Sequence, residues 1–275
     1  SLVLAACALG ATLAVHAEDA YPSKPVKVIV ALPAGGSVDM VARLVGQYLA
    51  ADLGQPFVID NKAGGSGQIG LPQVAKAPPD GYTLMVSPAS FLTTNKSLFK
   101  SLPYNPETDF APITKLANQA MVLVVPEKSR FASMADLLAA AKAAPGKLTY
   151  ASSGDGSPQH LAGLMLENRA GIKLLHVPYK GGAPAITDLI GGQVDLMIDV
   201  MPNTAPQVRG GRVRGLAVST AQRVPSFAEL PTVAESGVPG FDVSAWDAVF
   251  APAGTPRAVV DKVNAAIHKA LADPE

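Results

Sequence analysis

Short apolar segments alternate with segments of helical periodicity along most of this chain. The first apolar segment, residues 26–31, is followed by residues 38–53, in which Val41, Leu44 and Val45 recur at helical spacing. Strands that alternate with amphipathic helices are typical of parallel α/β folds. The order of the segments therefore predicts an α/β protein with parallel-rich sheets.

The composition is that of a folded protein with no nucleic-acid partner. The chain has 275 residues, of which 48% are hydrophobic and 16% are charged, which argues against disorder. This length makes two domains a reasonable expectation. The formal net charge is zero and no run of Lys or Arg occurs, so nothing in the charge pattern favours DNA or RNA as a ligand.

The strand and helix patterns divide into two sets. A fully apolar segment at residues 121–125 ends the first set, and a strand-like segment at 213–218 closes the second. A Pro-rich segment then leads to a last strand and helix. The chain therefore passes from a first lobe to a second and back again. Two such connections form a hinge, with a ligand cleft between the lobes. We expect lobe 1 to comprise residues 18–125 and 220–275, and lobe 2 to comprise residues 126–219.

The N-terminus resembles an export signal. Residues 1–15 are apolar and small, and the A-x-A pattern that ends at Ala17 predicts cleavage there, with residues 1–17 as signal peptide. Because the chain starts without Met or a basic segment, we expect that its beginning is clipped. Lipid anchoring through Cys7 is the alternative, but the apolar run continues beyond Cys7. The sequence therefore predicts a periplasmic protein.

Two glycine-containing loops each follow a predicted strand and begin a predicted helix. They are residues 33–39 and residues 152–158. Glycine allows close approach of a ligand to the backbone, and the first-turn N–H groups of a helix attract anions. Two such loops, far apart in the sequence, could bind one small anion from two sides. Asp39 would repel an anion, so we expect its carboxylate to orient the first loop.

Other motifs in the chain have simpler interpretations than catalysis or cofactor binding. Residues 65–70 match G-x-G-x-x-G, but Pro72 lies just inside the following helix, so a helix-start turn is favoured over a dinucleotide site. His160 and His176 have no neighbour at metal-ligand spacing. We therefore expect no cofactor, no metal and no catalytic residues.

Seven segments carry a combined pattern: residues 21–39, 61–65, 80–84, 109–113, 177–181, 188–195 and 250–256. These segments together resemble the Bug/TctC family, the extracytoplasmic solute receptors of tripartite tricarboxylate transporters. The resemblance covers essentially the whole chain after the signal.

The resemblance implies a two-lobed periplasmic-binding-protein (Venus flytrap) fold. It also implies a small carboxylate ligand, such as a di- or tricarboxylate, an acidic amino acid or an aromatic acid, and delivery to membrane permease subunits by a monomer. Family members continue with further helical residues beyond Ala272, so a truncated C-terminus is expected. The ligand-binding residues carried over are Ala34, Gly35, Gly36, Ser37, Asp39, Ser87, Ala89, Ser153, Gly154, Gly156, Ser157, His160 and Asp199.

Two other functions stay open from the sequence. A receptor that presents its ligand to a signalling partner would use the same binding chemistry. An exported serine hydrolase would use Ser157 or Ser37 with His160, but the sequence contains no G-x-S-x-G motif and no assembled triad.

Overall fold

A computed structural model of the chain describes residues 21–273. The predicted signal peptide, including Cys7 and the cleavage position after Ala17, lies outside these residues. The described residues contain no helix that is both long and apolar enough to cross a bilayer.

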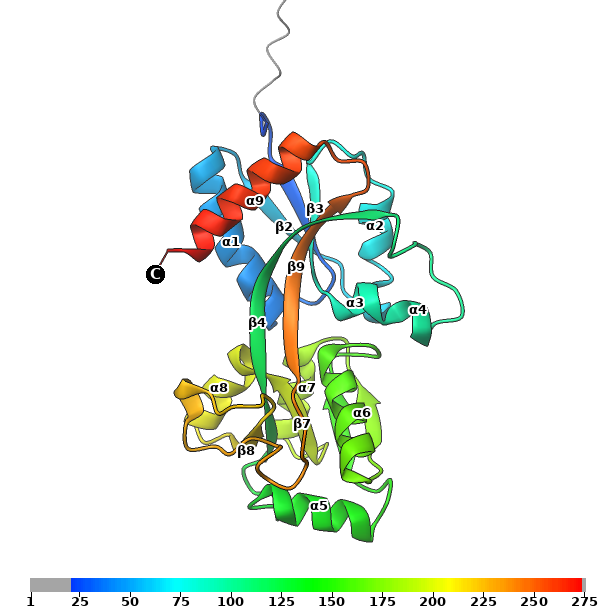
Figure 1. The fold of residues 1–275 in the computed structure, drawn as a ribbon, viewed down its shortest axis with the longest axis vertical. Helices are drawn as coiled ribbons and strands as arrows, with labels where there is room; N and C mark the ends of the chain where they lie inside the picture. Colours follow the sequence, from blue (N-terminus) through cyan, green and yellow to red (C-terminus); the bar gives the residue numbers. More distant parts are fainter. Residues whose placement is uncertain (1–20, 274–275) are drawn as a thin grey trace, which may run out of the picture.

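Strands and helices alternate along the chain (Figure 1). The strands are β1 (Val26–Val30), β2 (Phe57–Asn61), β3 (Thr83–Pro88), β4 (Phe110–Pro126), β5 (Thr149–Ser152), β6 (Leu175–Pro178), β7 (Leu196–Val200), β8 (Val213–Val218) and β9 (Ser244–Pro252). The α-helices are α1 (Ser37–Leu53), α2 (Leu71–Ala75), α3 (Ser90–Thr93), α4 (Asn95–Leu98), α5 (Met134–Ala143), α6 (Pro158–Ala170), α7 (Gly182–Ile190), α8 (Met201–Arg209) and α9 (Arg257–Leu271).

Within residues 21–273 the strands form one sheet in the order β2-β1-β3-β9-β4-β7-β5-β6, and β8 also pairs with β4. Pairing is parallel around β1 and around β5. It is antiparallel where β9 and β4 join the two halves. Figure 1 shows the two halves as separate lobes, with β4 and β9 running between them. The α/β, two-lobed architecture predicted from the sequence is therefore confirmed.

The core of lobe 1 has two layers because side chains of its strands alternate between the faces of the sheet. Val28 and Val30 pack on the face covered by α1 and α9. Ile29 and Ala31 pack on the other face, together with residues of α2 and α3. Residues 28–31 are thus buried on both faces of the sheet, which explains the apolar run that follows the exposed Lys27.

Lobe 2 repeats this arrangement around the second half of β4. Leu123 packs with α5 and α6 on one face, and Val124 packs with α7 and α8 on the other. Ser133 caps α5 by accepting a hydrogen bond from the backbone N–H of Asp136, as its position before the helical pattern predicted.

The segment after β8 packs against lobe 2. Phe227 joins the core that contains α7 and α8, and Val233, Val238 and Phe241 join the core that contains α5 and α6. The strand pattern of the second lobe ends at residue 218, which predicts that residues 220–243 belong to lobe 1. These contacts lead us to propose that lobe 2 continues to about residue 243.

Strand β4 and helix α8 differ from what the sequence predicts. The strand expected at 121–125 begins at Phe110, because residues 110–120 pair with β9. Helix α8 has no counterpart among the elements predicted from the sequence, and it contains two prolines, Pro202 and Pro206. Pro202 lies in the first turn, where its missing N–H costs nothing.

Candidate functional site

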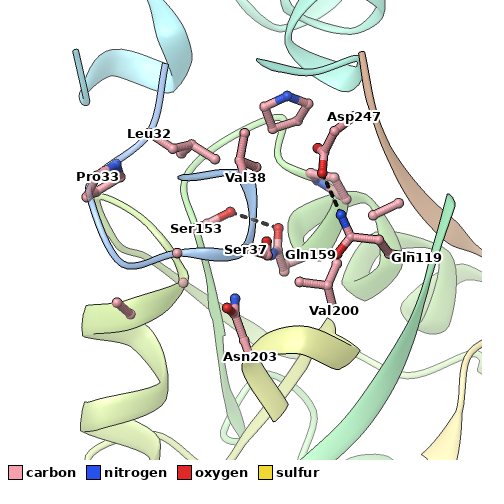
Figure 2. Close-up of a pocket in the computed structure, with 16 residues that line it drawn as sticks. Leu32, Pro33, Ser37, Val38, Gln119, Ser153, Gln159, Val200, Asn203 and Asp247 are labelled. Carbon is pink, nitrogen blue, oxygen red and sulfur yellow. Dashed lines mark hydrogen bonds between the residues drawn. The ribbon is translucent and has the colours of Figure 1, made fainter. Parts of the chain in front are cut away.

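A pocket lies between the two lobes, at the ends of β1, β3, β7 and β9 (Figure 2). It contains about 450 Å³ of space free of protein atoms, part of which is open to solvent. The residues that line it come from both lobes: Leu32, Pro33, Gly36, Ser37, Val38, Pro88, Gln119, Ser153, Pro158, Gln159, Gly182, Ala183, Val200, Asn203, Ala245 and Asp247.

Four helices begin at this pocket. Helix α1 contributes Gly36 and Ser37, and α6 contributes Pro158 and Gln159. Helices α7 and α8 also begin there, with their first-turn residues in the lining. The first N–H groups of a helix have no partner within it, and the helix dipole places partial positive charge at this end. The pocket wall formed by these helices therefore favours a bound anion.

Asp39 holds the first loop in place. Its Oδ2 accepts hydrogen bonds from the Gly35 N–H at 2.9 Å and from Arg43 Nε at 3.0 Å, and its Oδ1 accepts one from Asn61 Nδ2 at 2.9 Å. Burial alone would raise the pKa of Asp39, but the hydrogen bonds from Arg43, Gly35 and Asn61 lower this pKa below its usual value. This carboxylate therefore orients the loop, as expected from the sequence.

A chain of hydrogen bonds supports the wall on the lobe 2 side. Ser153 Oγ donates to Gln159 Oε1 at 2.8 Å, and Gln159 Nε2 donates to Asp199 Oδ1 at 2.6 Å. Asp199 Oδ2 accepts from Asn203 Nδ2 at 3.0 Å. Asp199 is fully buried, and burial raises its pKa, although these donors and the Val200 N–H oppose the shift. Asp199 therefore positions Gln159 and Asn203, and does not itself line the pocket.

The opposite wall, formed by β4 and β9, has a different chemistry. Gln119 Nε2 donates to Asp247 Oδ2 at 2.5 Å, and both side chains line the pocket (Figure 2). Burial raises the pKa of Asp247 to about 6, against the opposing effect of the Gln119 hydrogen bond. This wall therefore offers hydrogen-bond acceptors, whereas the helix starts offer donors.

The structure brings some of the predicted site residues together and separates others. Gly36, Ser37 and Ser153 line the pocket. Gly154 lines a second hollow, which adjoins the first at Leu32 and Ser153. The remaining predicted residues line neither of these hollows: Ala34, Gly35, Asp39, Ser87, Ala89, Gly156, Ser157, His160 and Asp199. Their assignment as ligand-binding residues stays a prediction.

Ser157 has a role in the local structure, and Ser87 and Ala89 flank a residue of the pocket. Ser157 caps α6 by accepting a hydrogen bond from the His160 N–H at 3.3 Å. Pro88, between Ser87 and Ala89, lies at the pocket and pairs with Asp247 across β3 and β9.

The lobes touch each other beside the pocket through glycines. The Gly156 carbonyl of lobe 2 accepts a hydrogen bond from Thr94 Oγ1 of lobe 1 at 3.3 Å. A Cβ at Gly156 would lie 2.8 Å from Leu98 and 2.9 Å from Asn95. A Cβ at Gly181 of lobe 2 would lie 2.7 Å from Pro33 of lobe 1. The absence of side chains at these two positions therefore permits the lobes to approach this closely.

His160 and His176 stack on each other near the start of α6. Their ring centroids are 4.1 Å apart and the ring planes differ by 3°. His160 Nδ1 accepts a hydrogen bond from the Gly156 N–H at 3.0 Å. Burial and the neighbouring His160 lower the pKa of His176 to about 4, and burial also lowers that of His160. Both rings are therefore neutral at pH 7.

With Asp155, these histidines form a cluster that the sequence spacing did not predict. Ring-nitrogen lone pairs lie in the ring planes, so two parallel stacked rings do not direct their lone pairs at one metal ion. Ser152 Oγ lies 2.6 Å from His176 Nε2, which would suit a nucleophile and base, but Ser152 is fully buried and hydrogen-bonded to Gly154. The arrangement is thus suited to fixing the loop before α6.

Sequence reasoning missed Gln119, Gln159, Asn203 and Asp247. Gln159 and Asn203 lie in the first turns of their helices, and this position could have indicated them. Gln119 and Asp247 lie on strands, where the sequence offers only their alternation with apolar neighbours as a signal.

Comparison with known proteins agrees with this architecture. Residues 41–275 match the family described as "Tripartite tricarboxylate transporter family receptor". A Pseudomonas sp. (strain P51) protein described as "UPF0065 protein in tcbD-tcbE intergenic region" is 45% identical over 94% of this chain and 76% of its own length. Protein BugT of Bordetella pertussis is 39% identical over 92% of this chain and 78% of its own length.

Solved structures resemble the whole fold. The periplasmic binding protein BugD has a TM-score of 0.87 and 41% identity, and the match covers 92% of this chain and 85% of that one. MatC of Rhodopseudomonas palustris, solved with malate, has a TM-score of 0.87 and 35% identity over 92% of this chain and 86% of that one. An R. palustris protein solved with adipate has a TM-score of 0.87 and 40% identity over 90% of this chain and 83% of that one. The chain therefore belongs to the family of tripartite tricarboxylate transporter receptors, which are periplasmic solute-binding proteins.

Proposed function

We propose that this protein captures a small carboxylate in the pocket between its lobes and delivers it to a membrane transporter. The observation that carries the proposal is the convergence of four helix starts from two lobes on one pocket. Backbone N–H groups at helix starts bind carboxylates without a full positive charge. The relatives solved with adipate and with malate support this ligand class.

In the proposed mechanism the ligand links the two lobes. A carboxylate bound at Gly36 and Ser37 of lobe 1 gains contacts with the starts of α6 and α7 only when lobe 2 approaches. A ligand that makes more contacts in one state shifts the population toward that state. Binding therefore favours the closed arrangement, which a transporter could distinguish from the open one.

The proposed partners follow from this role. The ligand-bound receptor would act as a monomer in the periplasm and dock on the permease subunits of a tripartite transporter. No catalytic step is part of the proposal, and a receptor that passes its signal to another protein would use the same closed state.

Calorimetry with mono-, di- and tricarboxylates and amino acids tests the proposal. We expect a ligand with a Kd of about 1 μM, which corresponds to about −8 kcal/mol. A Cβ at Gly36 meets only the Pro33 carbonyl oxygen, at 3.7 Å, and the φ of Gly36 is −84°, so a larger side chain fits the backbone and enters the pocket. The Gly36→Val variant should therefore lose at least tenfold in affinity.

The control is Gly36→Ser, because serine is small and is favoured at the first cap of a helix. This variant should bind within a fewfold of the unmodified protein. The proposal would be contradicted by a panel in which no carboxylate binds, by full affinity of Gly36→Val, or by steady turnover of ester substrates at the pocket.

A further inference from the structure

Asp247 is the one ionisable side chain among the described residues that line the pocket. It lies on β9 between β3 and β4, and its residue is only 2% exposed. Its hydrogen-bond partner is the neutral amide of Gln119, and no ion pair joins it to a described Lys, Arg or His. A buried carboxylate without a cation is costly, which makes this group unusual for a pocket that binds anions.

Gln119 adds a second acceptor that has no donor. Its Nε2 donates to Asp247, and this bond fixes the orientation of the amide because a carboxylate can accept but not donate. Gln119 Oε1 is consequently left without a hydrogen-bond partner. This matters because the residue is 92% buried, so water does not replace the missing partner. Among the described residues, none donates to Asp247 Oδ1. The β4–β9 wall thus presents two acceptors, Asp247 Oδ1 and Gln119 Oε1, which are without a donor in residues 21–273, and no positive charge.

We propose that Asp247 and Gln119 bind the ammonium group of a zwitterionic ligand, a small amino acid whose carboxylate lies at the helix starts. The inference rests on the proposed function, because the carboxylate end is the one described there. An ammonium group supplies the missing positive charge and three N–H donors. A simple dicarboxylate would instead place its second carboxylate beside that of Asp247, and two neighbouring negative charges repel each other.

The burial of Asp247 is consistent with this role. Burial raises its pKa to about 6, so the carboxyl group is still ionised at pH 7.5 when the pocket is empty. An ammonium group would pair with the Asp247 carboxylate, which is already charged in the empty protein. Binding would therefore not require Asp247 to lose a proton first. A hydroxyl group would supply one donor without the charge.

Matched ligands that differ at one group test the inference. Aspartate, malate and succinate share two carboxylates and differ in carrying an ammonium, a hydroxyl or neither, and glutamate and glutarate form a second pair. Calorimetry at pH 7.5 with the full chain should show each amino acid binding at least tenfold more tightly than its analogue without the ammonium. The Asp247→Asn variant should lose this preference while keeping the shape of the side chain.

Glu229→Gln is the control, because Glu229 is exposed and lies outside the pocket, so the variant makes the same change in net charge. It should keep the preference for the amino acid. Thermal unfolding of Asp247→Asn should show a Tm at least as high as that of the unmodified protein at pH 7.5, because the substitution removes a buried charge.

The possible results separate the two proposals. If succinate or malate binds the unmodified protein as tightly as aspartate, or if Asp247→Asn keeps the preference, the inference is overturned and the carboxylate receptor remains. If neither carboxylates nor amino acids bind, the proposed function fails and the inference fails with it.

Discussion

Asp199 and Asp247 are both buried near the pocket, but their hydrogen-bond partners give them different roles. Asp199 accepts hydrogen bonds from Gln159, Asn203 and the Val200 N–H, so its acceptor sites are occupied within the protein. Asp247 has a single donor, Gln119. A satisfied buried carboxylate stabilises the wall around it, whereas a partly satisfied one is available to a ligand.

The stacked histidines predict a specific dependence of stability on pH. The pKa of His176 is about 4 in the folded protein and about 6.5 in an unfolded chain. Between these values the unfolded chain binds more protons, so the free energy of unfolding falls as the pH is lowered from 7 to 4. One such group gives a slope of up to about 1.4 kcal/mol per pH unit.

Asp247 gives a slope of opposite sign, because its pKa is raised to about 6 and the folded protein binds the extra proton. The effect of His176 is therefore measured as the difference in unfolding free energy between the unmodified protein and a variant without this histidine. Urea unfolding of the unmodified protein and of His176→Gln at pH 7, 6, 5 and 4 should show the variant losing less stability on acidification. Parallel curves for the two proteins would refute the assignment.

Two glycines of similar backbone conformation separate the effect of backbone strain from that of contact between the lobes. Gly156, before α6, has a φ of +73°, and Gly146, after α5, has a φ of +71°. A side chain at either position incurs the same left-handed strain, about 1 kcal/mol. A Cβ at Gly156 would collide with Leu98 and Asn95 of the other lobe, whereas a Cβ at Gly146 has no neighbour within 4 Å.

We therefore expect Gly156→Ala and Gly146→Ala to lose similar amounts of stability, about 1 kcal/mol each, and to differ in ligand binding. Gly156→Ala should bind the calorimetric ligand at least fivefold more weakly, because the lobes can no longer approach. Gly146→Ala should bind with unchanged affinity. Equal affinities for the two variants would mean that the contact across the lobes does not contribute to binding.

At the scale of the whole molecule, the long strands β4 and β9 connect the two lobes. The lobes can therefore move relative to each other only by bending at these strands. Residues 110–120 of β4 pair with β9, whereas residues 121–126 pair with β7 and β8. The change of partner occurs between Ala120 and Met121, and the register of β4 shifts on both sides of this point. Shifts of this kind bend a strand, so this place is suited to a hinge.

Hinge closure predicts a change in overall size. Small-angle X-ray scattering should show a smaller radius of gyration when a saturating ligand is added. The decrease should be absent in Gly156→Ala under the same saturation, since that variant keeps the pocket but resists closure. An unchanged radius of gyration in the unmodified protein with a ligand bound would exclude the hinge mechanism.

Much of the architecture and part of the site follow from neighbouring residues in the chain. The apolar segment at 26–30 and the helical periodicity of 37–53 depend on contacts along one strand or one helix, and the structure forms both. The glycine loops before α1 and α6 were located for the same reason, and Gly36 and Ser153 from these loops lie at the pocket.

The remaining features depend on packing between distant segments. Gln119 and Asp247 are 128 residues apart, and their contact exists because the pairing of β4 with β9 places Ala117 opposite Asp247 and Gln119 two residues further along β4. The assignment of residues 220–243 likewise depends on which core buries Phe227 and Val233. Local periodicity decides which segments become strands and helices, because the contacts within one helix or along one strand join residues that are close in the sequence. The chemistry of the pocket is decided when the sheet and the lobes assemble, since only then do side chains from separate strands meet.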